Sequence, residues 1–208
     1  MKFILTFSII ILLQCQAVAD WKFGVSAGAS PNYLVSLKGN GVSSGAAYSI
    51  EYELKYGSGA DFGVDLWNTP QDSWGFISGL QYGADRELKS GTANGVVLNV
   101  GTSVSKYQTH YVYLGTAYRW SSFYIPLAVS YGFTHFTPAP SSLNAGQIII
   151  TENGPGVQLG VGWFIGEHIV IEYVGRAVTT AMNVTAGADS EKTKGMISSA
   201  LLNLKLLY

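Results

Sequence analysis

The side chains that most often carry chemistry are sparse in this sequence. Its three histidines are His110, His135 and His168, and no two of them have the spacing of a metal-binding pair. The sequence contains neither a phosphate-binding P-loop nor the nucleophile elbow of the α/β-hydrolases. We therefore predict no catalytic residue, no metal and no cofactor, and a protein that is not an enzyme. An active site assembled from scattered residues is the alternative that this pattern leaves open.

Charged side chains, in contrast, recur at alternate positions of segments whose other positions are apolar. Residues at alternate positions of an extended strand point to the same side. The candidate set is Glu51, Glu53, Lys55, Asp61, Asp65, Glu172 and Arg176. Glu172 and Arg176 stand about 13 Å apart along a strand, so each needs partners on other strands. We expect Lys55 to pair with Glu172. The expected partners of Arg176 are the other acidic residues of the set, Glu51, Glu53, Asp61 and Asp65.

Strands must position these charges, and period-two alternation predicts strands along most of the chain. The clearest run places five apolar residues on one side, Tyr48, Ile50, Tyr52, Leu54 and Tyr56. We predict that this even-numbered face meets lipid and that the intervening charges point into a lumen. The even-numbered apolar face continues through Phe62, Val64 and Leu66, which favours one strand across Gly57-Ser58-Gly59.

The last segment, 196–208, alternates in the same way. Its even positions are Met196, Ser198, Ala200, Leu202, Leu204, Leu206 and Tyr208, and its odd positions include Ser199, Asn203 and Lys205. A strand this apolar at the edge of a soluble sheet would promote aggregation. The pattern favours a strand whose even face meets lipid and which closes a barrel against the first strand.

Short turns alternate with long loops between the predicted strands. Turns are predicted at 68–73, 119–122 and 166–167, loops at 38–41, 137–154 and 183–195, and a hairpin that projects beyond the membrane at 88–106. Trp67 and Trp74 flank the first turn and are predicted to join an aromatic girdle. Pro126 lies inside a predicted strand, where it lacks a ladder donor, so we expect a bulge there. The fold predicted is all-β: an antiparallel up-and-down transmembrane β-barrel of eight strands, with ten as the alternative.

The first 19 residues have the composition of a signal peptide. Lys2 precedes the apolar stretch 3–13, and Ala17-Val18-Ala19 forms a small-residue cleavage site. We expect cleavage after Ala19, which leaves one domain, 20–208, and removes Cys15, the only cysteine. No later apolar run is long enough for a membrane helix.

The charge composition also fits a membrane barrel. Charged residues make up 12% of the chain, against about 25% in ordinary soluble domains. The formal net charge of −1 gives no reason to expect a nucleic-acid partner.

Taken together, these features resemble the small outer-membrane β-barrel superfamily typified by the membrane domain of OmpA, OmpX and OmpW. The residues that carry the resemblance are Ala17-Val18-Ala19, Phe123-Tyr124-Ile125-Pro126-Leu127, Gly160-Val161-Gly162-Trp163 and the ending at Tyr208. The resemblance implies a bacterial outer-membrane location, with membrane lipids and the barrel-assembly machinery as partners. It also implies an assembly signal formed by Leu204, Leu206 and Tyr208, although many members end in Phe.

The superfamily includes anchors, adhesins, small-solute conduits and a few enzymes, so the resemblance implies no single activity. The histidines lack the His-x-Ser pattern of the lipid A deacylase barrels. We predict a monomer with a structural or surface-interaction role through its outer loops, whose lumen the charge network fills. The alternatives are a narrow channel for small solutes or cations, then an envelope enzyme; a soluble secreted β-protein is the alternative fold.

Overall fold

The strands of this protein join into one closed ladder, seen in a computed structural model that describes residues 21–98, 105–138 and 147–208. The predicted signal peptide, 1–19, lies outside the described residues. The strands are β1 (Lys22–Ser30), β2 (Tyr33–Ser43), β3 (Ala46–Tyr56), β4 (Gly59–Asn68), β5 (Ser73–Gly83), β6 (Arg86–Ala93), β7 (Val96–Val97), β8 (Lys106–Trp120), β9 (Phe123–Thr137), β10 (Gln147–Glu152), β11 (Gly154–Ile165), β12 (Ile169–Ala186) and β13 (Asp189–Leu207). None of the described segments forms a helix that is long and apolar enough to cross a membrane.

Apart from the short β7, the strands make eight crossings, because four crossings are each built from two strands in line. These are β1 with β2, β3 with β4, β5 with β6, and β10 with β11. Each crossing pairs antiparallel with its two neighbours around the circle. The last strand pairs with the first, Leu207 opposite Gly24, and this pairing closes the barrel. The prediction of an eight-stranded, up-and-down barrel is confirmed.

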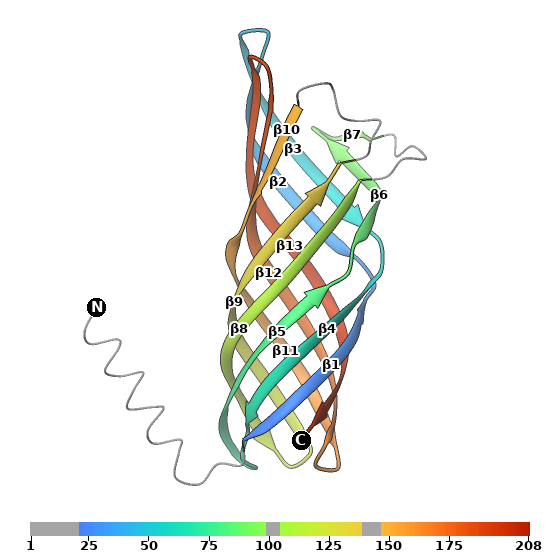
Figure 1. Cartoon of the computed structure of the whole chain (residues 1–208), viewed down its shortest axis with the longest axis vertical. Helices are drawn as coiled ribbons and strands as arrows, with labels where there is room; N and C mark the ends of the chain where they lie inside the picture. Colours follow the sequence, from blue (N-terminus) through green and yellow to red (C-terminus); the bar gives the residue numbers. More distant parts are fainter. Residues whose placement is uncertain (1–20, 99–104, 139–146) are drawn as a thin grey trace, which may run out of the picture.

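The two ends of the barrel differ in how their strands are joined (Figure 1). Short turns connect β4 to β5, β8 to β9 and β11 to β12 at one end, where the C-terminus also lies. At the other end the hairpins β2–β3 and β12–β13 extend well beyond the remaining strands. We call these two parts the short-turn half and the hairpin half.

The outer surface of the short-turn half is apolar and is bordered by aromatic side chains. Phe62, Leu80, Val129 and Leu202 are among its exposed residues. Rings pack in T-shaped or tilted pairs around the short-turn end, at centroid distances of 5.7 Å for Trp21–Phe76, 5.4 Å for Trp74–Tyr118 and 4.7 Å for Trp120–Phe123. An apolar band with an aromatic girdle is the surface that a bilayer requires.

Three neighbouring crossings change face between the two halves. Each is broken by two residues, Pro31-Asn32 between β1 and β2, Gly57-Ser58 between β3 and β4, and Ala84-Asp85 between β5 and β6. Below the break Phe62 points outward and Asp61 inward, whereas above it Tyr56 is fully buried and Lys55 is exposed. The alternation of apolar residues therefore continues through the break while the side that they face is reversed.

This reversal corrects the prediction for 48–56. Tyr52 and Leu54 pack inward against a buried cluster that includes Tyr33, Val35 and Tyr56. From Tyr52 to Tyr56 the even-numbered face of β3 is thus part of the interior and does not meet lipid, whereas Tyr48 is 38% exposed. The predicted face rested on one unbroken strand, whereas a break that shifts the side-chain period by one residue moves every later side chain to the other face.

Four further predictions, of two loops, a bulge and a girdle residue, are wrong. The segments 38–41 and 183–195 are not loops. β2 continues as far as the turn at Ser44-Gly45, β12 continues to Ala186, and β13 already begins at Asp189. Pro126 causes no bulge, because Leu127 lies opposite Leu159 and Tyr124 opposite Gly162, in the same register on both sides of the proline. Trp67 does not join the girdle, since it is only 1% exposed and lies inside the barrel.

Candidate functional site

The interior of the barrel is filled in three layers. An aromatic layer at the short-turn end contains Trp67, Tyr124 and Phe164. An apolar layer inside the hairpin half contains Tyr33, Val35, Leu37, Tyr107 and other residues of the buried cluster around Tyr56. Between them lie the buried charged side chains, Asp61, Asp65, Arg86, Glu172, Arg176 and Lys205. This charge layer is the candidate functional site, because it gathers the buried ionisable side chains of the lumen.

Lys205 of β13 is the centre of the lower part of the charge layer. Its Nζ lies 2.9 Å from Oε2 of Glu172 and 3.4 Å from Oδ1 of Asp65. The same ammonium group lies 4.7 Å from the ring centre of Trp67, a cation–π contact with the aromatic layer below. One buried cation of β13 thus joins two carboxylates, from β4 on one side of it and from β12 on the other.

Tyrosine hydroxyls donate further hydrogen bonds to both carboxylates, although Oδ2 of Asp65 has no partner among the described residues. Tyr113 of β8 donates to Oδ1 of Asp65, and Tyr124 of β9 donates to Oε1 of Glu172 at 2.8 Å. Asn203 donates a long hydrogen bond of 3.5 Å to Glu172. Buried ion pairs persist when further hydrogen bonds offset their desolvation, and these contacts supply them.

A glycine provides the space for Tyr124. A Cβ added to Gly162 would stand 2.0 Å from a ring carbon of Tyr124 and 2.5 Å from its hydroxyl oxygen. Only glycine lets the ring lie flat against β11 with its hydroxyl aimed at Glu172. Gly162 belongs to the segment Gly160-Val161-Gly162-Trp163 that carries the family resemblance, and the structure gives that residue this packing role.

The upper part of the charge layer is built around Asp61 of β4. Arg86 of β6 donates from Nη2 to Oδ2 of Asp61 at 2.9 Å, and its guanidinium lies 3.8 Å from the ring centre of Tyr33. Tyr33 donates to the other carboxylate oxygen at 3.4 Å. Arg176 stands apart from this pair, donating from Nε to Gln158 at 3.2 Å and lying over the ring of Tyr111.

Two expected pairings are therefore wrong. The cation beside Glu172 is Lys205, because Lys55 lies in the hairpin half and points outward. Among the described residues Arg176 forms no ion pair, because Arg86 occupies the carboxylate of Asp61 that we expected it to use.

The structure divides the predicted charge network into two groups. Asp61, Asp65, Glu172 and Arg176 lie inside the barrel, at most 5% exposed. Glu51, Glu53 and Lys55 lie outside it, on the outer face of β3, and Glu51 forms an exposed ion pair with Lys38 at 2.6 Å. These three residues were misplaced because β3 was assigned the face of β4.

Two cations that complete the interior were not in the predicted network. Lys205 occupies an odd position of the last strand, together with Asn203, and that polar face pointed to it. Arg86 had no such signal, because its inward position depends on the break at Ala84-Asp85. With both included, three cations balance three carboxylates among the buried side chains of the described chain.

The last strand has the orientation that its sequence predicted. Leu204, Leu206 and Tyr208 point outward, and Tyr208 exchanges two backbone hydrogen bonds with Phe23 of β1, of 2.9 and 2.7 Å. Their role as an assembly signal stays a prediction.

The histidines are dispersed over the wall of the barrel. His110 stacks on Tyr82 with ring centres 4.5 Å apart, and His168 forms a hydrogen bond from Nδ1 to the carbonyl of Leu207. In the described ranges no group of three or more His, Cys, Asp or Glu residues is arranged to hold a metal ion.

Comparison with solved structures identifies the fold. The crystal structure of the outer membrane protein OprG from Pseudomonas aeruginosa matches with a TM-score of 0.61 and 14% identity, covering 91% of this chain and 97% of that chain. The solid-state NMR structure of the outer membrane protein AlkL in DMPC lipid bilayers matches with a TM-score of 0.57 and 18% identity, covering 90% of each. No family model and no curated protein matches the sequence. The chain has the fold of the small outer-membrane β-barrel proteins, as its resemblance to them predicted.

Proposed function

We propose that this protein is a non-conducting barrel of a bacterial outer membrane that presents its hairpin half to a binding partner at the cell surface. Export through a cleaved signal peptide, insertion by the barrel-assembly machinery and a monomeric state belong to the same proposal, as does the absence of catalysis. The observation that carries it is the balanced charge layer. Three cations and three carboxylates, all buried, cross the lumen between an aromatic layer and an apolar layer.

Contacts between the two long hairpins support a binding role for the hairpin half. The carboxylate of Asp189, at the β12–β13 tip, accepts hydrogen bonds from the backbone amide of Ser44 at 2.8 Å and from the Ser43 hydroxyl at 3.3 Å. Below the tips, Oε2 of Glu191 accepts hydrogen bonds from the hydroxyls of Tyr48 and Tyr52, at 3.2 and 3.1 Å. The two hairpins are thus fastened together, and a surface that is ordered before binding loses less entropy when a partner binds.

A narrow channel is the second candidate, and a different observation favours it. Several polar atoms inside the barrel have no protein partner among the described residues, including Ser26 Oγ, Gln81 Oε1, Thr109 Oγ1 and Ser130 Oγ. Buried polar groups without protein partners usually bind water. A hydrated region beside the charge layer would conduct if the ion pairs of that layer separated.

Conductance in planar bilayers distinguishes the two candidates. The wild-type protein should show no steady conductance, because the charge layer and the two layers that border it fill the lumen. Arg176→Ala, which removes a guanidinium that spans the space between Gln158 and Tyr111, should show small openings. The exposed variant Lys55→Ala is the matched control and should behave like wild type. A steady, cation-selective wild-type conductance would overturn the non-conducting barrel and support the channel.

A further inference from the structure

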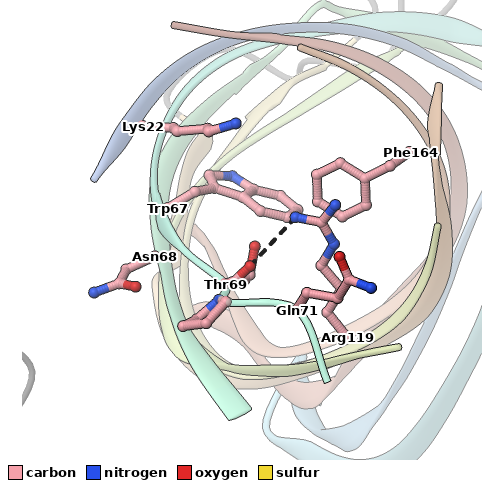
Figure 2. Close-up of a pocket in the computed structure, with 8 residues that line it drawn as sticks. Lys22, Trp67, Asn68, Thr69, Gln71, Arg119 and Phe164 are labelled. Carbon is pink, nitrogen blue, oxygen red and sulfur yellow. Dashed lines mark hydrogen bonds between the residues drawn. The ribbon is translucent and has the colours of Figure 1, made fainter. Parts of the chain in front are cut away.

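The mouth of the barrel at the short-turn end contains a cavity that the proposed function does not use (Figure 2). Its volume is about 190 Å³, and its walls include Lys22, Trp67, Asn68, Gln71, Arg119 and Phe164. These residues come from β1, from the end of β4 and the turn that follows it, from β8 and from β11. The cavity lies beneath the charge layer, with the aromatic layer between them.

Two cations of this mouth have no carboxylate partner. Nζ of Lys22 donates to the carbonyl of Glu167 at 2.9 Å, and the guanidinium of Arg119 donates to the carbonyls of Ser121 and Thr69. Within the described part of the chain, neither residue has a carboxylate oxygen within 4.0 Å. The carboxylates of Glu167 and Asp72 act on Arg119 only at longer range.

A buried donor without a partner points to the same cavity. Trp67 is 1% exposed, and its Nε1–H has no hydrogen-bond acceptor among the described residues. Figure 2 shows this indole nitrogen on the edge of the ring that faces Lys22. The ammonium group of Lys205 lies over the Trp67 ring at 4.7 Å, but it is paired with Glu172 and Asp65 and so adds no free charge to the cavity. Buried N–H groups are seldom left unpaired in native proteins, and an acceptor in the cavity would pair this one.

We infer that this mouth binds a small oxyanion, a carboxylate or a phosphate group, between Lys22, Trp67 and Arg119. The three donors differ in kind, an ammonium, an indole N–H and a guanidinium, and all can bind an anionic oxygen. The Arg119 guanidinium lies 3.8 Å above the ring centre of Phe164, and this contact fixes its position at the cavity. The anion is either a soluble carboxylate or phosphate or the phosphate of a membrane lipid.

The test follows the indole N–H resonance of Trp67 by NMR, using the full protein in detergent micelles. The chain has five tryptophans, and Trp67→Phe identifies the resonance while it keeps an aromatic ring in the layer. Sodium acetate and sodium phosphate are titrated against sodium chloride at constant ionic strength. Either anion should shift the Trp67 resonance saturably and leave the other four indole signals unchanged.

Two variants keep Trp67: one tests the contribution of Arg119, and the other is its control. Arg119→Gln should weaken binding about tenfold, the loss expected for one hydrogen bond to a charged group. Lys89→Gln, an exposed residue of β6 whose ion pair is with Glu87, is the matched control and should bind like wild type. Heat-dependent migration on a gel should show that both variants fold.

The outcomes separate the proposal from its alternatives. No saturable shift with either anion would overturn it, as would equal binding by folded Arg119→Gln and wild type. In nanodiscs without added anion, a Trp67 shift that requires phosphatidic acid supports the site and identifies a lipid phosphate as its source. A shift that occurs only with the soluble anions supports the site and identifies a soluble ligand.

Discussion

The short-turn half and the hairpin half of this barrel have opposite arrangements of polar and apolar side chains. In β4, Phe62 and Val64 are exposed on the outside while Asp61 and Asp65 are buried inside. In β3, Leu54 and Tyr56 are inside while Glu53 and Lys55 are outside. In these two strands the short-turn half thus has the outer surface of a membrane protein, and the hairpin half has that of a soluble sheet. Breaks of two residues in three adjacent crossings separate the two arrangements.

The comparison shows what alternation in a sequence does and does not determine. Period-two alternation identifies a strand and its two faces, and the medium around each half decides which face points outward. Because the reversal coincides with the breaks, the same strands expose apolar side chains to lipid on one side of the breaks and polar side chains to water on the other.

The largest predicted difference between the halves concerns lysines. Lys205→Met should destabilise the barrel by about 3–5 kcal/mol, because it leaves the buried carboxylates of Asp65 and Glu172 without their cation. Lys55→Met, on the outside of the hairpin half, should leave the unfolding midpoint unchanged. Urea unfolding in detergent measures both variants. Equal effects would mean that the two lysines occupy similar environments, contrary to the structure.

A smaller difference is expected for charges introduced on the outer surface. Val64→Arg, in the apolar band, should cost about 2–4 kcal/mol if its position is near the bilayer midplane. Glu53→Arg, on the outer face of β3, should change the stability by no more than about 0.5 kcal/mol, as is usual at exposed positions. Unfolding from lipid vesicles measures the two costs. A large loss of stability in Glu53→Arg would place β3 within the membrane and contradict the reversal.

The smallest of these effects concerns two glycines of the short-turn half. Gly162→Ala should cost about 1–3 kcal/mol, because the new methyl group displaces the Tyr124 ring that donates to Glu172. Gly175→Ala is the control, since a Cβ there would meet only the Leu159 carbonyl oxygen, at 3.7 Å. Thermal unfolding in detergent compares them. If both substitutions were tolerated equally, Tyr124 would not be held as the structure shows.

Local pattern was sufficient to predict the barrel and its last strand. The segment from Met196 to Tyr208 does not change face, so its outward leucines and inward Asn203 and Lys205 followed from spacing once the apolar face was assigned to lipid. Predictions for β3 were wrong because Gly57-Ser58 contains nothing that distinguishes a face-reversing break from a continuous strand. The extension of β12 and β13 was missed because 183–195 is polar, as expected of strands that stand beyond the apolar band.

Pairings inside the lumen were harder to predict than the faces of the strands. The side of the sheet on which Glu172 lies follows from its own strand, but its partner Lys205 depends on the register between β12 and β13. The position of the Arg86 side chain depends on both a break and a register. The position of the Trp67 ring depends on the inward turn of the end of β4. These are long-range properties of the closed ladder, which spacing within one segment does not contain.

The reversal itself can be tested most directly with spin labels. Cys15, the only cysteine, lies in the predicted signal peptide, so single cysteines at Phe62 and Glu53 can be labelled in the processed protein after reconstitution into bilayers. The label at 62 should be accessible to oxygen dissolved in the lipid and shielded from a water-soluble nickel complex. The label at 53 should show the opposite behaviour. A label at 53 that is shielded from the nickel complex, whether by lipid or by the lumen, would contradict the account.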